Sequence, residues 1–229
     1  MIRENIAAVE TFIKEASEKR QSDMTEKVKL VAVTKNHTVS EIREAIDAGT
    51  AFIGENRIQE ASEKYQQLGN TVEWHLIGHL QTNKAKQAVK IFDLIESVDS
   101  IKIAEAINKE AAKIDKVQDI LVQVNLVKEQ SKNGVYMEDL PALLLDIDSL
   151  EKLRLRGLMF IAPNVENLEE VRPMFNSMYK LFRKVQKMEF LNADIKYLSM
   201  GMTHDYKIAI EEGANIVRVG TAIFGPRQY

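Results

Sequence analysis

The residues best suited to chemistry are one lysine near the N-terminus and two glycine-bearing turns near the C-terminus. Lys35 closes the apolar run LVAVTK, and the turns read LSMGMT at 198–203 and RVGTAIFG at 218–225. A lysine amine can condense with an aldehyde, and glycine lets backbone N–H groups approach an anion closely. If the three segments meet, they form a pocket with an amine, an anion cradle and the Arg218 guanidinium. That set suits an aldehyde-bearing phosphate cofactor held as a Schiff base.

Apolar runs of strand length alternate with helical patterns along the chain, which predicts a parallel sheet covered by helices. The runs expected as strands are 29–35, 51–55, 72–77, 92–98, 119–125, 153–160, 195–200 and 215–220. The expected helices are about 2–20, 39–48, 56–68, 82–90, 100–114, 137–149, 166–188 and 203–212. Eight such strands predict an α/β fold, a (β/α)8 TIM barrel with an extra N-terminal helix. An open doubly wound sheet is the alternative.

Residues at the expected helix ends agree with this division. Gly49 and Gly213 stand where helix C-caps are expected, and Ser40 and Asp99–Ser100 stand near helix N-termini. No low-complexity or Pro/Gly-rich segment divides the chain. Residues 1–229 are therefore predicted to form one domain.

The composition argues against several functional classes. A net charge of −3 without a long basic block does not suggest a nucleic-acid partner. Cysteine is absent, so disulfides, thiol nucleophiles and cysteine metal sites are excluded. No apolar run approaches the roughly 18 residues that span a bilayer, and the N-terminus begins an amphipathic helix rather than a signal peptide. We expect a cytoplasmic protein that binds no membrane.

In barrels of this kind, functional groups gather at the C-terminal ends of the strands, and phosphate often binds after strands 7 and 8. Ser199 and Thr221 could add hydroxyl donors to the two turns. Strand alternation places Arg218 and Gly220 on one side, with their apolar neighbours on the other. The alternatives are ordinary turns with helix caps, and a Lys35 that is merely solvated at a strand end.

Other polar residues near the expected mouth have weaker signals. Asn56 could contact a phenolate or phosphate oxygen, or could cap the next helix. His75 and His79 have a spacing that binds metal on a helix, but they straddle a strand end and a glycine, so no metal site is predicted. We expect His37 and His204 to line the pocket. No residue is predicted to be catalytic.

These segments together resemble the pyridoxal phosphate homeostasis proteins, which are single-barrel relatives of the alanine racemase N-terminal domain. The resemblance covers nearly the whole chain. Its motifs are VAVTK at 31–35, GENRIQE at 54–60, WHLIGHLQTNK at 74–84, VNLVKEQSKNG at 124–134, GLMFIAP at 157–163, LSMGMTHDYKIAI at 198–210 and VRVGTAIFG at 217–225. Three positions depart from the usual pattern: Thr203 replaces serine, Leu76 replaces phenylalanine and Arg57 replaces an aromatic residue.

The resemblance implies a cofactor and its contacts. Lys35 would form the internal aldimine with pyridoxal 5′-phosphate (PLP), Arg218 would face the pyridine nitrogen, and Asn56 would lie on the phenolic side of the ring. The residues implied around the phosphate are Ser199, Gly201, Met202, Gly220 and Thr221.

The implied function is PLP homeostasis, meaning storage, buffering or delivery of the cofactor without substantial catalysis. The recipients would be apo enzymes that use PLP. An amino-acid racemase or decarboxylase is the main alternative, and a sugar-phosphate enzyme with a Schiff-base lysine is another. Two features favour the carrier. Arg218 cannot accept a proton from the pyridine nitrogen, and the second, β-rich domain of dimeric racemases has no counterpart before Tyr229, so a monomer is expected.

Overall fold

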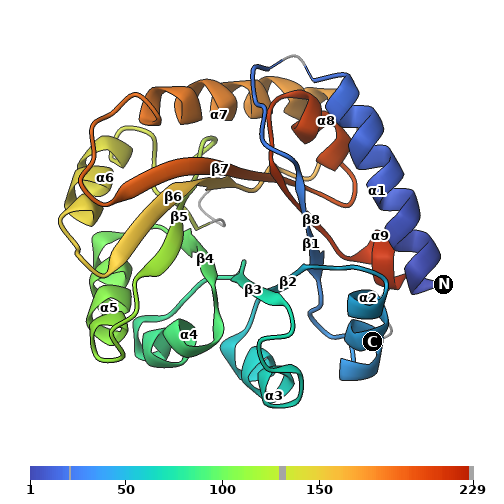
Figure 1. Cartoon of the computed structure of the whole chain (residues 1–229). Coiled ribbons are helices and arrows are strands. Elements are labelled where there is room, and N and C mark those ends of the chain that lie inside the picture. The colour runs from blue at the N-terminus through green and yellow to red at the C-terminus, as the bar shows by residue number, and fades with distance from the viewer. Residues whose placement is uncertain (21, 129–132, 227–229) are drawn as a thin grey trace.

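The computed structural model of the chain describes residues 1–20, 22–128 and 133–226. Within them, parallel strands pair in chain order and the last pairs with the first, so the sheet closes into a barrel (Figure 1). The strands are β1 (Lys29–Val33), β2 (Phe52–Glu55), β3 (Glu73–Leu76), β4 (Leu94–Val98), β5 (Gln118–Val124), β6 (Leu153–Phe160), β7 (Ala193–Met202) and β8 (Ile216–Val219). The closed sheet confirms the predicted (β/α)8 barrel and excludes the open doubly wound sheet.

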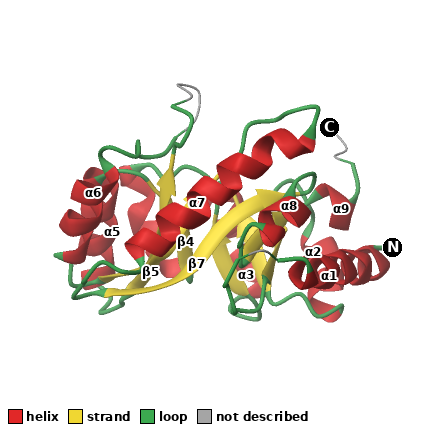
Figure 2. Ribbon diagram, turned by 90° about the horizontal axis from the view of Figure 1, so that it is seen from above, coloured by secondary structure: helices red, strands yellow, loops and turns green. Residues whose placement is uncertain are grey.

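Helices surround the barrel on its outer side (Figure 1). They are α1 (Ile2–Glu18), α2 (Val39–Asp47), α3 (Ile58–Leu68), η1 (Thr82–Lys84), α4 (Ala85–Ile91), α5 (Ile101–Ala112), α6 (Leu140–Asp148), η2 (Leu168–Val171), α7 (Arg172–Val185), α8 (Tyr206–Glu211) and α9 (Thr221–Phe224). The extra N-terminal helix is confirmed: α1 packs against α2, α8 and α9 at one edge of the molecule (Figure 2). None of the helices in the described part of the chain is both long and apolar enough to cross a membrane.

Several predicted element boundaries were wrong near the mouth of the barrel. Strand β1 ends two residues before Lys35, and β7 continues through Gly201 to Met202. The helix expected over 203–212 is shortened to α8, and α9 was not predicted because four residues are too few for a periodic pattern. The motif at 124–134 lies partly in 129–132, outside the described residues.

The helix-end predictions had mixed outcomes. Thr38, not Ser40, caps α2: its hydroxyl accepts a hydrogen bond from the Glu41 N–H, and the Glu41 side chain accepts one from the Thr38 N–H. Gly49 and Gly213 do follow helix ends with φ of 102° and 108°, as a left-handed C-terminal cap requires. Ser100 is the N-cap residue of α5.

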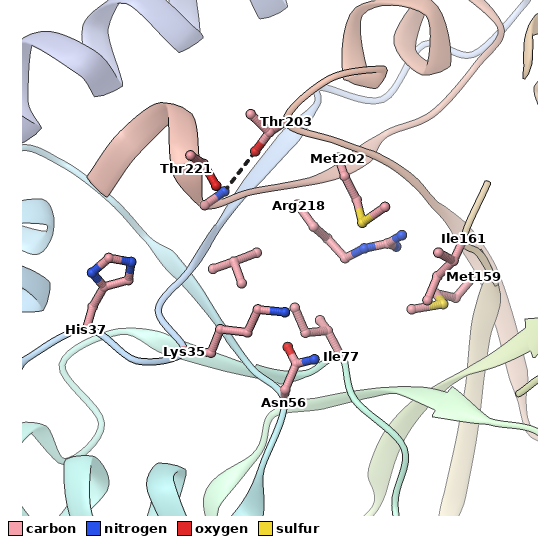
Figure 3. Close-up of a pocket in the computed structure, with 12 residues that line it drawn as sticks. Lys35, His37, Asn56, Ile77, Met159, Ile161, Met202, Thr203, Arg218 and Thr221 are labelled. Carbon is pink, nitrogen blue, oxygen red and sulfur yellow. Dashed lines mark hydrogen bonds between the residues drawn. The ribbon is translucent and has the colours of Figure 1, made fainter. Parts of the chain in front are cut away.

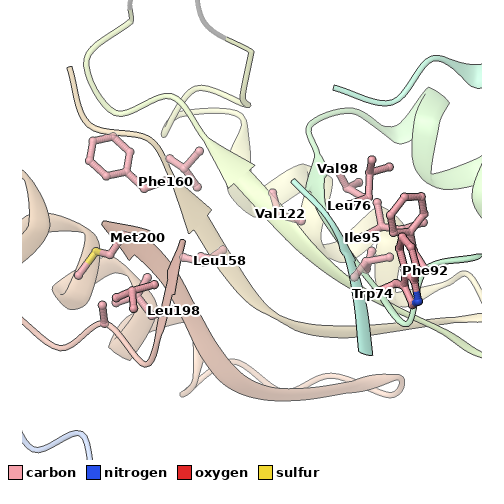
Figure 4. Close-up of a cluster of buried hydrophobic side chains, with 14 of the residues drawn as sticks. Trp74, Leu76, Phe92, Ile95, Val98, Val122, Leu158, Phe160, Leu198 and Met200 are labelled. Atoms are coloured by element: carbon pink, nitrogen blue, oxygen red, sulfur yellow. The ribbon is translucent and has the colours of Figure 1, made fainter. Parts of the chain in front are cut away.

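Successive residues of a strand point to opposite faces of the sheet. The apolar side chains that hold the barrel together therefore form two groups, one on each face. The larger group packs the sheet against the helices and includes Trp74, Phe92 and Phe160 (Figure 4). Burying each such side chain contributes roughly 2–3 kcal/mol. The smaller group consists of Val31, Leu94, Leu121, Met159 and Ile216, which alternate with residues of the outer group and therefore fill the barrel interior.

Candidate functional site

A cavity of about 130 Å³ opens at the C-terminal ends of the strands (Figure 3). Six of the eight predicted cofactor residues line it: Lys35, Asn56, Met202, Arg218, Gly220 and Thr221. The rest of the lining is Val33, His37, Ile77, Met159, Ile161 and Thr203. Ser199 and Gly201 are not part of the lining. Segments far apart in the sequence thus meet at one pocket, as closure between β1 and β8 requires.

Lys35 lies in the turn that leaves β1, and its side chain points into the cavity toward Asn56 and Arg218 (Figure 3). The turn is closed by the His37 N–H, which donates to the Thr34 carbonyl at 3.1 Å. Asn36 adopts a left-handed φ of 64°, a conformation that asparagine tolerates better than most residues. The amine is therefore presented from a defined turn at the mouth of the barrel.

Asn56 follows β2 on the neighbouring side of the cavity. Its Oδ1 is buried and has no hydrogen-bond partner among the described residues. The backbone passes close to the next loop, since a Cβ on Gly78 would lie 2.3 Å from the Asn56 carbonyl oxygen. A buried amide with an unused polar atom is costly unless a ligand completes its bonding. Asn56 is thus suited to meet a polar ligand atom.

Arg218 forms the inner wall of the cavity and is only 2% exposed. Its Nη1 donates to the Ser199 hydroxyl at 2.6 Å and its Nη2 donates to the Phe160 carbonyl at 2.8 Å. The Glu96 carboxylate lies 3.6 Å from Nη1. Burial lowers the pKa of Arg218, while Glu96 and Asp205 oppose that effect. The guanidinium keeps its charge, because arginine is not deprotonated in proteins.

Glu96 is fully buried in the barrel interior and binds three side chains. His75 Nδ1 lies 2.7 Å from one carboxylate oxygen, and the Ser199 hydroxyl donates to the other. Burial opposes ionisation, but the His75 hydrogen bond and charge, with Arg218 and Ser199, hold the pKa of Glu96 below its ordinary value. An ionised carboxylate only accepts, so we assign the proton of the His75–Glu96 bond to Nδ1. This interior network fixes the position of Arg218.

The two predicted phosphate turns meet at the rim of the cavity. The Gly220 N–H donates to Thr203 Oγ1 at 3.3 Å (Figure 3). The Met202 N–H donates to the Asp205 carboxylate at 2.6 Å, and burial raises the pKa of Asp205. The Gly220 N–H thus bonds to an oxygen of the other turn, whereas the Met202 N–H bonds to an oxygen of its own loop. Thr221 is an exposed residue of the same rim.

Two predicted phosphate residues, Ser199 and Gly201, occupy different places. Ser199 is fully buried between Glu96 and Arg218. Gly201 has a φ of 94°, and a Cβ there would lie 2.6 Å from the Ala209 Cβ and 2.9 Å from the Tyr206 Cα. Glycine is therefore required there for the close contact of β7 with α8. Direct contact of these two residues with a phosphate stays a prediction.

Sequence reasoning overlooked the interior partner of Arg218. Glu96 stands within the apolar run FDLIESV, and a carboxylate in a buried strand demands a partner, so a signal was present. Thr203 was also not assigned to the site. His37 lines the cavity as expected and stacks on Phe224 with ring centroids 4.4 Å apart, whereas the expectation for His204 was wrong, because it is exposed and does not line the cavity.

The two histidines with metal-like spacing reach different carboxylates. His75 binds Glu96, whereas His79 Nδ1 lies 3.8 Å from Asp99. In residues 1–20, 22–128 and 133–226, no group of three or more His, Asp or Glu side chains could hold a metal ion.

Comparisons with known proteins agree with the geometry. The profile of the alanine racemase N-terminal domain matches residues 10–228. The pyridoxal phosphate homeostasis protein of Aquifex aeolicus is 44% identical over 88% of this chain and 88% of its own length. That of Haemophilus influenzae is 38% identical over 96% of this chain and 92% of its own length.

Solved structures agree as well. PipY of Synechococcus elongatus, solved with PLP bound, superposes with a TM-score of 0.86 at 36% identity, covering 98% of this chain and 100% of that one. An alanine racemase of Clostridium difficile, at 16% identity and a TM-score of 0.74, shares the fold over 100% of this chain and 57% of its own. The chain belongs to the alanine racemase N-terminal domain family and, within it, to the pyridoxal phosphate homeostasis proteins.

Proposed function

We propose that this protein binds PLP and serves intracellular PLP homeostasis by storing, buffering or delivering the cofactor. The observation that carries the proposal is the convergence of Lys35, Asn56 and Arg218 on one cavity whose rim bears threonine hydroxyls. The names of the relatives and the PLP bound in PipY support it.

The side chains around the cavity fit this cofactor. An aldehyde condenses with a lysine amine and releases water, which supplies a reversible covalent link. Lys35 is the lysine that lines the cavity and would hold the cofactor there. Asn56, which lines the same cavity, would donate an N–H of its side-chain amide to the phenolic oxygen of the ring.

The phosphate would lie at the rim, where Thr203, Gly220 and Thr221 gather. The Gly220 N–H donates to the Thr203 hydroxyl in this structure. Both groups are hydrogen-bond donors, so both would donate to a phosphate bound at the rim. Met202 would contribute from the same rim. Ser199 and Gly201 are proposed members of this set, and Ser199 also holds Arg218 from behind.

Arg218 argues against a role as an amino-acid enzyme. A PLP enzyme draws electrons most strongly when the pyridine nitrogen is protonated, and a carboxylate partner favours that form. Arg218, held by Ser199 and the Phe160 carbonyl, would offer only donors to the nitrogen. We infer a carrier without substantial catalytic activity. The racemase or decarboxylase alternative is not strengthened by a 16% identical racemase, because that likeness concerns the fold alone.

The setting of the protein is also part of the proposal. We propose one domain that acts as a monomer in the cytoplasm, with PLP as ligand and apo PLP-dependent enzymes as recipients. We propose no nucleic-acid or membrane partner.

An absorbance spectrum and a trapping experiment test the function directly. Protein loaded with PLP should be yellow, and borohydride should fix the cofactor mass on the peptide that contains Lys35. Pyridoxal, which lacks the phosphate, should bind far more weakly. Equal affinity for the two compounds would contradict the phosphate assignment. Exchange of an amino acid's α-hydrogen with deuterium at enzyme-like rates would contradict the carrier.

A further inference from the structure

A second group of charged side chains lies outside the cavity, beside the turn that bears Lys35. It consists of Glu55 at the end of β2 and Glu60 and Lys64 on α3. Lys64 is only 6% exposed and Glu55 is fully buried. We refer to these three residues as the α3 cluster. None of them lines the cavity.

Lys64 is the centre of the α3 cluster. Its Nζ donates to Glu55 Oε1, to Glu60 Oε1 and to the Thr34 carbonyl, each at 2.7 Å. These three acceptors match the three donors of a lysine ammonium. Glu60 precedes Lys64 by one helical turn, the orientation that favours an ion pair within a helix. The cluster therefore joins α3 to the end of β1.

The hydrogen bonds to the backbone enclose Lys35 on both sides. The Thr34 carbonyl belongs to the peptide group before Lys35, and it accepts from Lys64. The Asn36 N–H belongs to the peptide group after Lys35, and it donates to Glu60 Oε1 at 2.5 Å. The α3 cluster thus restrains both peptide groups that flank Lys35.

Charge and burial make this restraint stiff. Burial raises the pKa of Glu55, against the influence of Lys64 and Thr34. Burial acts in the same sense on Glu60, but the hydrogen bonds from Lys64 and the Asn36 N–H prevail and lower its pKa. Lys64 therefore bonds a carboxylate that is ionised at neutral pH, in a region from which water is largely excluded. Charge-assisted hydrogen bonds of this kind are roughly twice as strong as neutral ones.

We propose that Lys64 and Glu60 are positioning residues, which fix the peptide groups on either side of Lys35 and so hold its amine at the approach angle that cofactor capture needs. The inference rests on the proposed function of Lys35 as the residue that links the cofactor. Precise orientation of reacting groups contributes to rate, and small displacements slow a reaction strongly. The cluster would act from outside the cavity without touching the cofactor.

The experiment compares two substitutions of Glu60, which is partly exposed and therefore tolerant of change. Glu60→Ala removes the acceptor of the Asn36 N–H, whereas Glu60→Gln keeps an oxygen there. Amide hydrogen exchange of the full-length apo protein is measured over residues 34–37, together with the rate constant of covalent capture of pyridoxal phosphate. Glu60→Ala should raise exchange at the Asn36 amide and slow capture about tenfold or more. Glu60→Gln should restore both values to within about threefold of the wild type.

Lys64→Met removes the cation at the centre of the α3 cluster and is therefore a larger change than Glu60→Ala. Arg172→Met is the matched control. Arg172 also bonds several carboxylates, of Glu169 on η2, Glu211 at the end of α8 and Glu212 directly after it. Lys64→Met should affect residues 34–37 and capture as Glu60→Ala does. Arg172→Met should lower stability and leave both readouts unchanged.

Two results overturn the positioning role. One is faster exchange over 34–37 with an unchanged capture rate, and the other is unchanged exchange in Glu60→Ala and Lys64→Met. If the wild type links pyridoxal phosphate at another lysine, the proposed function of Lys35 fails. In that case the exchange data still decide whether the α3 cluster holds the peptide groups of Lys35.

Discussion

Two arginines occupy opposite ends of the barrel, and their surroundings differ. Arg218 on β8 lines the cavity at the C-terminal end, and its carboxylate neighbour, Glu96, is fully buried. Arg156 in the first half of β6 bonds Asp194 and lies over the Tyr197 ring, 5.1 Å from its centroid. The Asp194 side chain is 39% exposed. Water thus solvates the partner at one end and is excluded at the other.

In barrels of this kind, functional groups gather at the C-terminal ends of the strands, and this is the end at which Arg218 lies. Partly exposed ion pairs contribute little, about 0–1 kcal/mol. A buried pair contributes little net stability as well, but the removal of one member leaves a charge without compensation. The Arg218 network is therefore poorly explained by stability alone. It holds a guanidinium in place at the wall of a cavity.

The largest difference is expected between the alanine variants of the two lysines of the β1 segment, Lys35 and Lys29. Lys35→Ala should abolish covalent capture of PLP, because the amine in the cavity is removed. Lys29→Ala removes an amine at the opposite end of β1, which lies 4.6 Å from the ring centroids of Phe52 and Tyr197, and should leave capture intact. Borohydride trapping followed by peptide mass spectrometry measures both. Undiminished capture by Lys35→Ala would remove the functional distinction between the two ends.

The arginine comparison can be tested by stability. Arg218→Met removes the guanidinium beside the buried Glu96, which keeps only its hydrogen bonds to His75 and Ser199, and should lower the free energy of unfolding by about 3–5 kcal/mol. Arg156→Met should lower it by about 1 kcal/mol. Urea denaturation measures the difference. The double variant Arg218→Met with Glu96→Gln should recover part of the loss, since no buried charge remains unpaired. Equal losses in the two single variants would mean that burial of the partner does not matter.

Two glycines with a positive φ, Gly201 and Gly49, provide a third test. Gly201→Ala should cost about 3 kcal/mol, because its φ is positive and its Cβ would overlap Ala209 and Tyr206. Gly49 also has a positive φ but open space around an added Cβ, so Gly49→Ala should cost only about 1 kcal/mol. Thermal unfolding measures the loss of stability in each variant. The difference between the two losses is the contribution of the overlap with Ala209 and Tyr206. A Gly201→Ala variant as stable as Gly49→Ala would contradict the close contact of β7 with α8.

The smallest effect concerns pH. The pKa of Glu96 is depressed in the folded protein, so its ionised form adds stability above its unfolded pKa of about 4.3. That contribution is lost as the pH falls through the lower, folded pKa. The stability difference between wild type and Glu96→Gln should therefore be constant above about pH 5 and shrink below about pH 4.

Asp194→Asn serves as the control at the other end of the barrel. The pKa of Asp194 is lowered too, because hydrogen bonds and charges of Lys196 and Arg156 outweigh its burial. Because Asp194 is more exposed than Glu96, the stability difference between wild type and Asp194→Asn should shrink less on acidification. Added salt should reduce that change further. A difference for Glu96→Gln that grows on acidification would contradict the assigned direction of the Glu96 shift.

The fold was predictable to a large extent because its signals are local. Alternating strand and helix patterns, with Gly49 and Gly213 at helix ends, led to the closed barrel that the structure has. Boundaries near the mouth were less predictable. The extension of β7 through Gly201 depends on its packing against α8, which no local pattern records.

The sequence by itself determined the chemistry that is available: a lysine after β1, an arginine in β8, glycines in the last turns and a whole-chain family resemblance. Only the tertiary structure decided the partners of these groups. Glu96 meets Arg218 across 122 positions, and Lys64 meets the Thr34 carbonyl, in the peptide group before Lys35, across 30 positions. Such pairings arise from barrel closure and from the exclusion of water, which act between segments and leave no periodic signal along the chain.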